Sequence, residues 1–325
     1  MEDSELYWLW LASAEGVGAT TANSLWAKLL DRGMPLEDFF ELDENAWAEE
    51  FGLNARVVRG LADQRARLDD LRVRAEELRE RGVRLVTLAG PHYPASLRKA
   101  LRRNAPPLLY ALGNLALLMR SAVAVIGARD ASPRGLALAR SIGATAVASG
   151  LVLVSGGARG IDSAAHVGAL AAGGETVVVL SCGILRYRPS ADLGAEADPE
   201  SVLYVSELAP TMSWEVGGAM ARNRIVCGLA SAVVVVEARE TGGTMQAART
   251  AVDMPRPLFV AKFRDFDIHS AGNATLLATG AHALKVEPDA SGETWTADLD
   301  PVVARIARAT PPEAAAGQMD LFGSQ

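Results

Sequence analysis

The chain has 325 residues, of which 50% are hydrophobic and 22% charged, and its formal net charge is −7. This composition excludes a mostly disordered chain, two cysteines exclude a disulfide scaffold or a zinc cluster, and the lack of an apolar run of ~18 residues excludes a membrane-spanning helix. We therefore expect a cytoplasmic protein of about two domains, with no leader peptide, no membrane partner, no metal and no cofactor.

Charge is distributed unevenly along the sequence. Residues 1–50 contain two basic and 12 acidic side chains, whereas residues 81–120 contain seven basic side chains and no acidic one. The negative total argues against a polyanionic partner, but the basic segment allows a cationic patch on the central part. A solvated helix face at residues 97–103 is the alternative, and the two interpretations are compatible.

Residues 1–80 are predicted to form a small all-helical domain. An apolar stripe at helical spacing is interrupted at Gly16-Val17-Gly18, and helical spacing resumes over Thr21–Leu30. This pattern is typical of a SAM or helix-hairpin-helix-like domain, whose hairpin amides can hold a backbone phosphate. Because the surrounding segment is acidic, we favour packing or protein contact there over DNA contact. Residues 55–80 are predicted to form one long exposed helix.

From residue 81 to 290, apolar β-branched runs alternate with helical stretches. The runs are Val83–Leu88, Ala122–Ile126, Val152–Val154, Thr176–Leu180, Val202–Val205, Ala232–Val236, Leu258–Val260 and Ala283–Val286. Strands that are apolar on both faces indicate a mainly parallel sheet covered by helices, so the predicted fold class is α/β, Rossmann-like and doubly wound. Ligands of such folds lie beyond the carboxyl ends of the strands. Residues 291–325 are predicted to be a short acidic C-terminal tail.

The first glycine turn follows the run Ala122–Ile126. It opens with Gly127, but Arg129 stands where a dinucleotide fingerprint has its second glycine and would block a pyrophosphate. An arginine at a helix mouth instead suits a single phosphate held by two hydrogen bonds. The alternative is a salt bridge across the top of the sheet.

The second turn follows Val152–Val154 and contains Ser155, Gly156, Gly157, Arg159 and Gly160. Its glycines leave backbone amides exposed at the start of a helix, as an anion site requires, and Asp162 is the expected N-cap. His166 lies one turn into that helix. We expect it to be a packed histidine hydrogen-bonded to the loop, not a catalyst or a metal ligand.

Two more segments complete a predicted groove. Arg222, Asn223 and Arg224 precede an apolar stretch with no neutralising acid nearby in the sequence, which favours phosphate binding over packing. Gly242, Gly243 and Thr244 form a further turn before a predicted helix at Met245–Ala251. Several such turns on one sheet edge predict a phosphate-lined groove, not a pocket for one nucleotide.

Taken in order, these segments resemble the DNA-processing protein A (DprA/Smf) family. The resemblance rests on His92–Leu97, Pro106–Tyr110, Val125–Arg129, Ser155–Asp162, Ser206-Glu207, Arg222–Ile225 and Thr241–Thr244. It implies a non-catalytic homodimer that binds single-stranded DNA, protects incoming strands in natural transformation and helps to load the RecA recombinase. The implied DNA-contact residues are Gly127, Arg129, Ser155, Gly156, Gly157, Arg159, Gly160, Arg222, Asn223, Arg224, Gly242, Gly243 and Thr244.

The sequence departs from the family pattern in several places. Gly217–Ala221 replaces the usual Phe-Pro, so Trp214 or Tyr187 is the candidate aromatic residue for stacking a base. Glu240 replaces a cation in the last glycine turn, and residues 291–325 contain no counterpart of the winged-helix domain of many members. These departures bear on base contact and affinity more than on the fold.

The last residues contain a short motif. Gln318-Met319-Asp320-Leu321-Phe322 resembles the peptide with which bacterial proteins dock on the replicative sliding clamp, with Gln318, Leu321 and Phe322 as the contacts. A tail that folds back on its own domain is the alternative.

An enzyme is the competing class. Rossmann-like nucleotide phosphoribohydrolases carry a catalytic Glu after a Gly-Gly-x-Gly-Thr turn, and Ala247 occupies that position here. Without this carboxylate, cleavage of an N-glycosidic bond lacks its acid/base group. A nucleotide-binding protein remains an alternative to a DNA-binding one.

Overall fold

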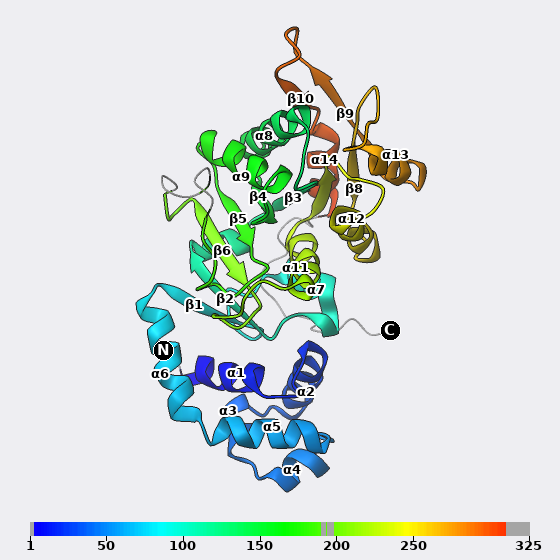
Figure 1. The fold of residues 1–325 in the computed structure, drawn as a ribbon. Coiled ribbons are helices and arrows are strands. Elements are labelled where there is room, and N and C mark those ends of the chain that lie inside the picture. Colours follow the sequence, from blue (N-terminus) through cyan, green and yellow to red (C-terminus); the bar gives the residue numbers. More distant parts are fainter. Residues whose placement is uncertain (1–2, 190–192, 194–197, 310–325) are drawn as a thin grey trace.

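The computed structural model describes residues 3–189, 193 and 198–309. A helical domain precedes a larger α/β domain, which lies above it in Figure 1. The helices of the first domain are α1 (Asp3–Ser13), α2 (Ala19–Arg32), α3 (Leu36–Glu41), α4 (Glu44–Glu49), α5 (Ala55–Arg65) and α6 (Leu68–Glu80). The predicted single helix over residues 55–80 is wrong, because the backbone of Arg67 (φ −113°, ψ 24°) leaves the helical region between α5 and α6.

Buried aromatic rings hold the helical domain together. Trp10, Phe39 and Trp47 are fully buried and contact one another. The indole nitrogen of Trp10 donates to Leu61 O and that of Trp47 donates to Phe39 O. The rings therefore bury a large apolar area without leaving an indole N–H unpaired.

The α/β domain is built on one sheet with the strand order β1-β2-β6-β5-β4-β3-β7-β8-β9-β10. The block from β6 to β9 is parallel, and β1, β2 and β10 join antiparallel at the edges. The strands are β1 (Val83–Thr87), β2 (Leu108–Gly113), β3 (Ala122–Ile126), β4 (Val152–Gly156), β5 (Thr176–Val179), β6 (Val202–Ser206), β7 (Ala232–Val235), β8 (Leu258–Lys262), β9 (His282–Pro288) and β10 (Trp295–Ala297). The predicted Rossmann-like, mainly parallel α/β fold is confirmed.

Helices cover both faces of the sheet (Figure 1). One face carries α8 (Pro133–Ala148), α9 (Ile161–Ala171) and α14 (Asp300–Ala309), and the other carries α11 (Val216–Leu229), α12 (Gly243–Asp253) and α13 (Ala271–Ala278), with α7 (Ala95–Leu101) against α11. Alternate residues of β3 enter the two cores, since Val123 and Val125 belong to the first and Ala124 and Ile126 to the second. A strand buried on both faces explains the unbroken apolar run in the sequence.

The predicted acidic tail is wrong for residues 291–309. Here β10 pairs with β9, and Leu299, Val302 and Ile306 of the α14 segment are buried in the core beneath α8. Their helical spacing forms an apolar stripe that a short segment can bury only because the sheet supplies the other half of the contact. The clamp-like residues Gln318, Leu321 and Phe322 lie outside the described residues.

The two domains share a continuous hydrophobic core. At their junction, the buried amide of Asn23 on α2 donates to Ala105 O at 2.8 Å, beside the short helix Arg102–Asn104. In the described part of the chain no helix is both long and apolar enough to cross a membrane.

Candidate nucleic-acid interface

The sheet brings the predicted turns to one edge. Because β3, β4 and β7 are parallel neighbours, the loops that follow their carboxyl ends lie side by side. The chain runs outward from β3 to β6 and returns to β7 on the other side of β3, so the strand order reverses between β3 and β7. Ligands of doubly wound sheets bind at this switch point.

The glycine loop after β4 is shaped by close backbone contacts. Gly160 has φ +88°, and a Cβ there would overlap the carbonyl oxygens of Ala128 and Arg129, so only glycine fits. The backbone N–H groups of Ala158, Arg159 and Gly160 donate to no other described residue. The loop therefore presents unpaired amides at the start of α9, as the sequence predicts for an anion site.

Arg222 is buried, with 7% of its surface exposed, and its Nη1 lies 3.2 Å from Asp162 Oδ2. The sequence shows no acid near this arginine and so favours phosphate binding over packing, but the structure pairs it with Asp162 of α9, 60 positions away. Asp162 is inside α9 and is not its N-cap; Gly160 takes that position. Burial raises the pKa of Asp162, and Arg222 opposes the shift. Gly156 makes room for this pair, since a Cβ there would overlap the Arg222 guanidinium.

Arg224 is also neutralised within the protein. Its guanidinium pairs with Glu207, which follows β6, and donates to Asn104 O. Burial raises the pKa of Glu207, and Arg224 opposes the shift. Asn223 is half-buried, and its amide donates to Gly243 O at 3.4 Å. The Arg-Asn-Arg cluster therefore links α9, the loop after β6 and α12 from its place on α11.

Four arginines at this edge are exposed and form no ion pair with any described residue: Arg129, Arg159, Arg186 and Arg188. The last two lie on the loop after β5 and are not among the residues predicted from the sequence; the available signal was an Arg-Tyr-Arg segment in the loop that follows a predicted strand. Arg186 Nε donates to Thr211 O at 3.0 Å, and Arg129 lies over the Trp214 ring at 5.7 Å.

The start of α12 is open. Gly242 has φ +112°, no side chain caps the helix, and a Cβ at Gly242 or Gly243 would meet no atom within 4 Å. Thr244 is half-buried behind them. The first N–H groups of α12 therefore face open space, where an anion can approach them.

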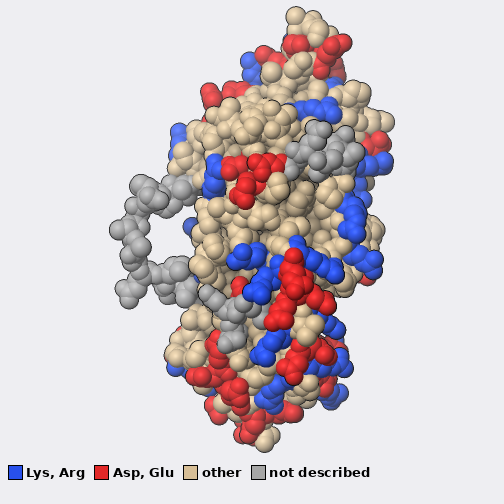
Figure 2. Space-filling model, turned by 90° about the vertical axis from the view of Figure 1, so that its left-hand side faces the viewer, with Lys and Arg blue, Asp and Glu red and all other residues tan. Residues whose placement is uncertain are grey.

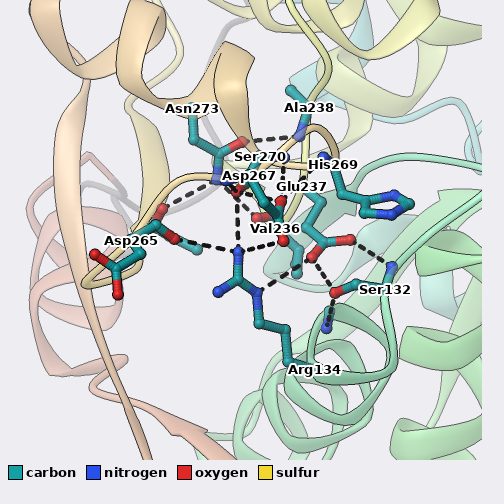
Figure 3. Close-up of polar contacts among 12 residues, drawn as sticks. Ser132, Arg134, Val236, Glu237, Ala238, Asp265, Asp267, His269, Ser270 and Asn273 are labelled. Atoms are coloured by element: carbon teal, nitrogen blue, oxygen red, sulfur yellow. Dashed lines mark hydrogen bonds and ion pairs between the residues drawn. The ribbon is translucent and has the colours of Figure 1, made fainter.

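The start of α8 differs, because a carboxylate of the protein occupies it. Glu237 is fully buried and accepts from Ser132 N at 2.9 Å and from Ser132 Oγ, with Arg134 Nε 3.9 Å away (Figure 3). A Cβ at Gly135 would overlap this carboxylate. Glu237 thus fills the position where a dinucleotide phosphate would meet the first βα turn after Gly127. This occupancy counts against the nucleotide-binding alternative.

His166 is packed, as the sequence predicts. Its Nε2 lies 3.1 Å from Gly156 O and its Nδ1 2.6 Å from Thr176 Oγ1. Burial lowers its pKa to about 4, so the ring is neutral at pH 7. Ser155 is also buried and donates to Val125 O, which leaves its hydroxyl hydrogen unavailable to a ligand.

Basic and acidic side chains intermingle away from this edge. Figure 2 shows Lys and Arg gathered between the helical domain, at the bottom, and the α/β domain, with Asp and Glu among them. The basic segment 81–120 forms β1, α7 and β2 at this level in Figure 1. Within it, Arg102 and Arg103 are exposed, whereas Arg120 pairs with Glu175.

Comparisons with known proteins agree on one family. The model described as DNA recombination-mediator protein A matches residues 84–293. Protein Smf from Synechocystis is 33% identical over 272 residues, 80% of this chain and 65% of that protein. The DNA processing protein DprA from Streptococcus pneumoniae is 34% identical over 191 residues, 58% of this chain and 67% of that protein.

Solved structures of similar fold indicate the same family. DprA from S. pneumoniae superposes with a TM-score of 0.71 at 28% identity, covering 87% of this chain and 94% of that one. DprA from Helicobacter pylori, whose structure concerns its single-stranded DNA binding mode, gives 0.54 at 29% identity and covers 62% and 90%. The chain belongs to the DNA recombination-mediator protein A family, whose curated members are named DprA or Smf.

Proposed function

We propose that this chain binds single-stranded DNA along the carboxyl edge of its sheet. The observation that carries the proposal is that four exposed arginines with no ion pair to any described residue, Arg129, Arg159, Arg186 and Arg188, share this edge with backbone amides that have no partner among the described residues. Guanidinium groups and helix-mouth amides are the donors that bind phosphates. Family membership and the single-strand binding named for the H. pylori relative support the same ligand.

Within this site the predicted residues divide into two roles. Arg129, Arg159 and the turns at Gly157–Gly160 and Gly242–Thr244 contact phosphates. Arg222 and Arg224 hold the loops in place through Asp162 and Glu207, because their charges are already compensated. Gly127, Ser155 and Gly156 act through the packing that shapes these loops.

The cellular role we propose follows the family. The chain protects incoming single strands in natural transformation and helps to load RecA as a homodimer, without catalysing a reaction. Light scattering tests the dimer, and RecA filament assembly on strands coated with a single-strand binding protein tests the loading. A clamp contact through Gln318, Leu321 and Phe322 is tested by pull-down with the sliding clamp. Release of a base from nucleoside monophosphates would contradict the non-enzymatic role.

The experiment for DNA binding is fluorescence anisotropy with labelled oligo-dT and a matched duplex at several salt concentrations. We expect preferential binding of the single strand, with a log–log salt slope near −0.7 per phosphate contacted, hence about −3 for ~4 contacts. Arg249→Gln is the matched control, since Arg249 is exposed and lines a groove with Leu258 and His282, at the amino ends of β8 and β9. Equal affinity for duplex, or no binding at low salt, would overturn the proposal.

A further inference from the structure

An exposed apolar strip lies beside the arginines of the proposed site. Met212, Trp214, Val216 and Met220 are 42%, 50%, 64% and 46% exposed. They are four of the ten large hydrophobic residues that are exposed in the described structure. They lie within one stretch of nine residues that runs from the loop after β6 into the first turns of α11. Such clustering of apolar side chains on a surface marks a contact site more often than scattered exposure does.

The strip is held in place at both ends. On one side, Gly183 N donates to Met212 O at 2.8 Å and Leu185 N donates to Pro210 O at 2.9 Å. On the other side, α11 begins at Val216, and the position of a Cβ on Gly218 would lie 3.1 Å from Ser181 O. Trp214 therefore lies in a short segment whose two ends are held in place. An aromatic side chain on such a support loses little conformational entropy when a ligand covers it.

Trp214 is also joined to the phosphate-binding side. The Arg129 guanidinium lies 5.7 Å from the centre of the Trp214 ring. Arg186 donates a hydrogen bond to Thr211 O, three residues before Trp214. A half-exposed indole thus lies next to exposed cations. A single strand offers a matching pair of surfaces, since its unpaired bases have free faces and its backbone is anionic.

Tyr187, the other aromatic residue near this edge, is less suited to the same task. Its ring packs against Tyr204, with 5.4 Å between centroids, and its Cε2 would lie 2.9 Å from a Cβ on Gly157. Both contacts keep Tyr187 against the glycine loop and reduce the ring surface left for a base.

We propose that Trp214 stacks a base of the bound single strand and that the strip Met212–Met220 forms the base side of the site, opposite the arginine side. This inference rests on the proposed function and adds to it the surface that distinguishes a single strand from a duplex. In a duplex the base faces are already stacked, so the strip gains nothing from it. Stacking is tolerant of base identity, so the site requires no particular sequence.

The test compares a labelled oligo-dT with an abasic strand of equal length, which keeps the phosphates but has no base to stack. For Trp214→Ala we expect oligo-dT affinity to fall about 5- to 30-fold, with abasic-strand affinity and the salt slope unchanged. Trp214→Phe keeps a ring and should retain most of the oligo-dT affinity. The control Val252→Ala removes an exposed apolar side chain from α12, in the groove at the amino ends of the strands, and should change neither.

The possible outcomes separate the two proposals. If Trp214→Ala binds oligo-dT as the wild type does, the stacking role is overturned while single-strand binding stands. Equal losses for the oligo-dT and abasic strands would also overturn it, because Trp214 would then act through Arg129 or the loop. If the wild-type protein binds no oligo-dT, the proposed function fails and the stacking role fails with it. Thermal melts of each variant establish that it is folded.

Discussion

At the scale of single residues, buried or half-buried carboxylates determine what each arginine can do. Asp162 and Glu207 hold Arg222 and Arg224, whereas Arg129 and Arg159 are exposed and form no ion pair with any residue that the structure describes. Removing one member of a buried ion pair leaves the other desolvated and uncompensated. Removing an exposed arginine costs little stability but removes a phosphate contact.

Arg222→Met should therefore destabilise the fold. We expect the free energy of unfolding to fall by about 3–5 kcal/mol, because Asp162 stays buried without its partner. The double variant Arg222→Met/Asp162→Asn should recover part of this loss, since no charge is then left unpaired. Urea unfolding of the three proteins measures both values. An additive double variant would show that the pair is not coupled.

Arg159 and Arg224 should differ in the salt dependence of DNA binding. Arg159→Gln should flatten the log–log slope by ~0.7, as expected for one lost contact to a single strand. Arg224→Gln should leave the slope unchanged, because Glu207 already compensates this guanidinium. Anisotropy titrations at several salt concentrations measure the slope of each variant. Both variants must first show the wild-type melting temperature. Equal flattening would place Arg224 among the phosphate contacts.

His166 should make stability depend on pH. Its pKa is lowered from 6.5 to about 4 in the fold, so between these values the unfolded chain binds a proton that the folded chain does not. Stability is therefore lost as the pH falls from 6.5 towards 4, by roughly 3 kcal/mol for a shift of this size. Asp162 has a raised pKa in the fold, so its contribution to stability changes with pH in the opposite direction. Comparison of the wild type with His166→Gln therefore isolates the contribution of His166. A steeper decline in the variant than in the wild type would refute the assignment.

At the scale of elements, the sequence predicts every strand of the parallel block but misses two of the three strands that pair antiparallel. The eight apolar runs all became strands, but β2 and β10, which pair antiparallel, were not predicted. The site shows the same limit: the turns were placed correctly because strand ends are local features. Asp162, Glu207 and Glu237 were missed as partners because each meets its arginine or helix from a different element of the fold, 17 to 105 positions away in the sequence.

Helix α14 allows a direct test of the fold, because the sequence predicts a tail where the structure has this packed helix. Val302 is fully buried, whereas Ala304 on the same helix is exposed. Val302→Asp should lower the free energy of unfolding by several kcal/mol, since it places an unpaired carboxylate in the core below α8, and Ala304→Asp should change it by no more than ~0.5 kcal/mol. Chemical denaturation measures both. Equal effects would mean that α14 does not pack on the sheet in solution.

At the scale of the whole molecule, the helical and α/β domains share one hydrophobic core, and Asn23 ties them together. The acidic first domain lies against the segment that carries Arg102 and Arg103, and there Thr20 Oγ1 donates to Asn104 Oδ1 at 3.2 Å. The same segment accepts a hydrogen bond from Arg224 through Asn104 O. The junction thus contacts the Arg-Asn-Arg cluster through this hydrogen bond and helps to hold it in place.

Because the two domains share one of the two cores, we expect one cooperative unfolding transition. Tryptophan fluorescence reports mainly on the helical domain, which contains Trp8, Trp10, Trp26 and Trp47, whereas far-UV circular dichroism reports on the whole chain. We expect the two urea transitions to coincide. Asn23→Ala should shift both together by about 1–3 kcal/mol, because it leaves Ala105 O buried and unpaired, and the exposed neighbour Ser24→Ala should shift neither. A fluorescence transition that moves alone would show that the helical domain unfolds independently, and the junction could then not support the DNA-binding edge.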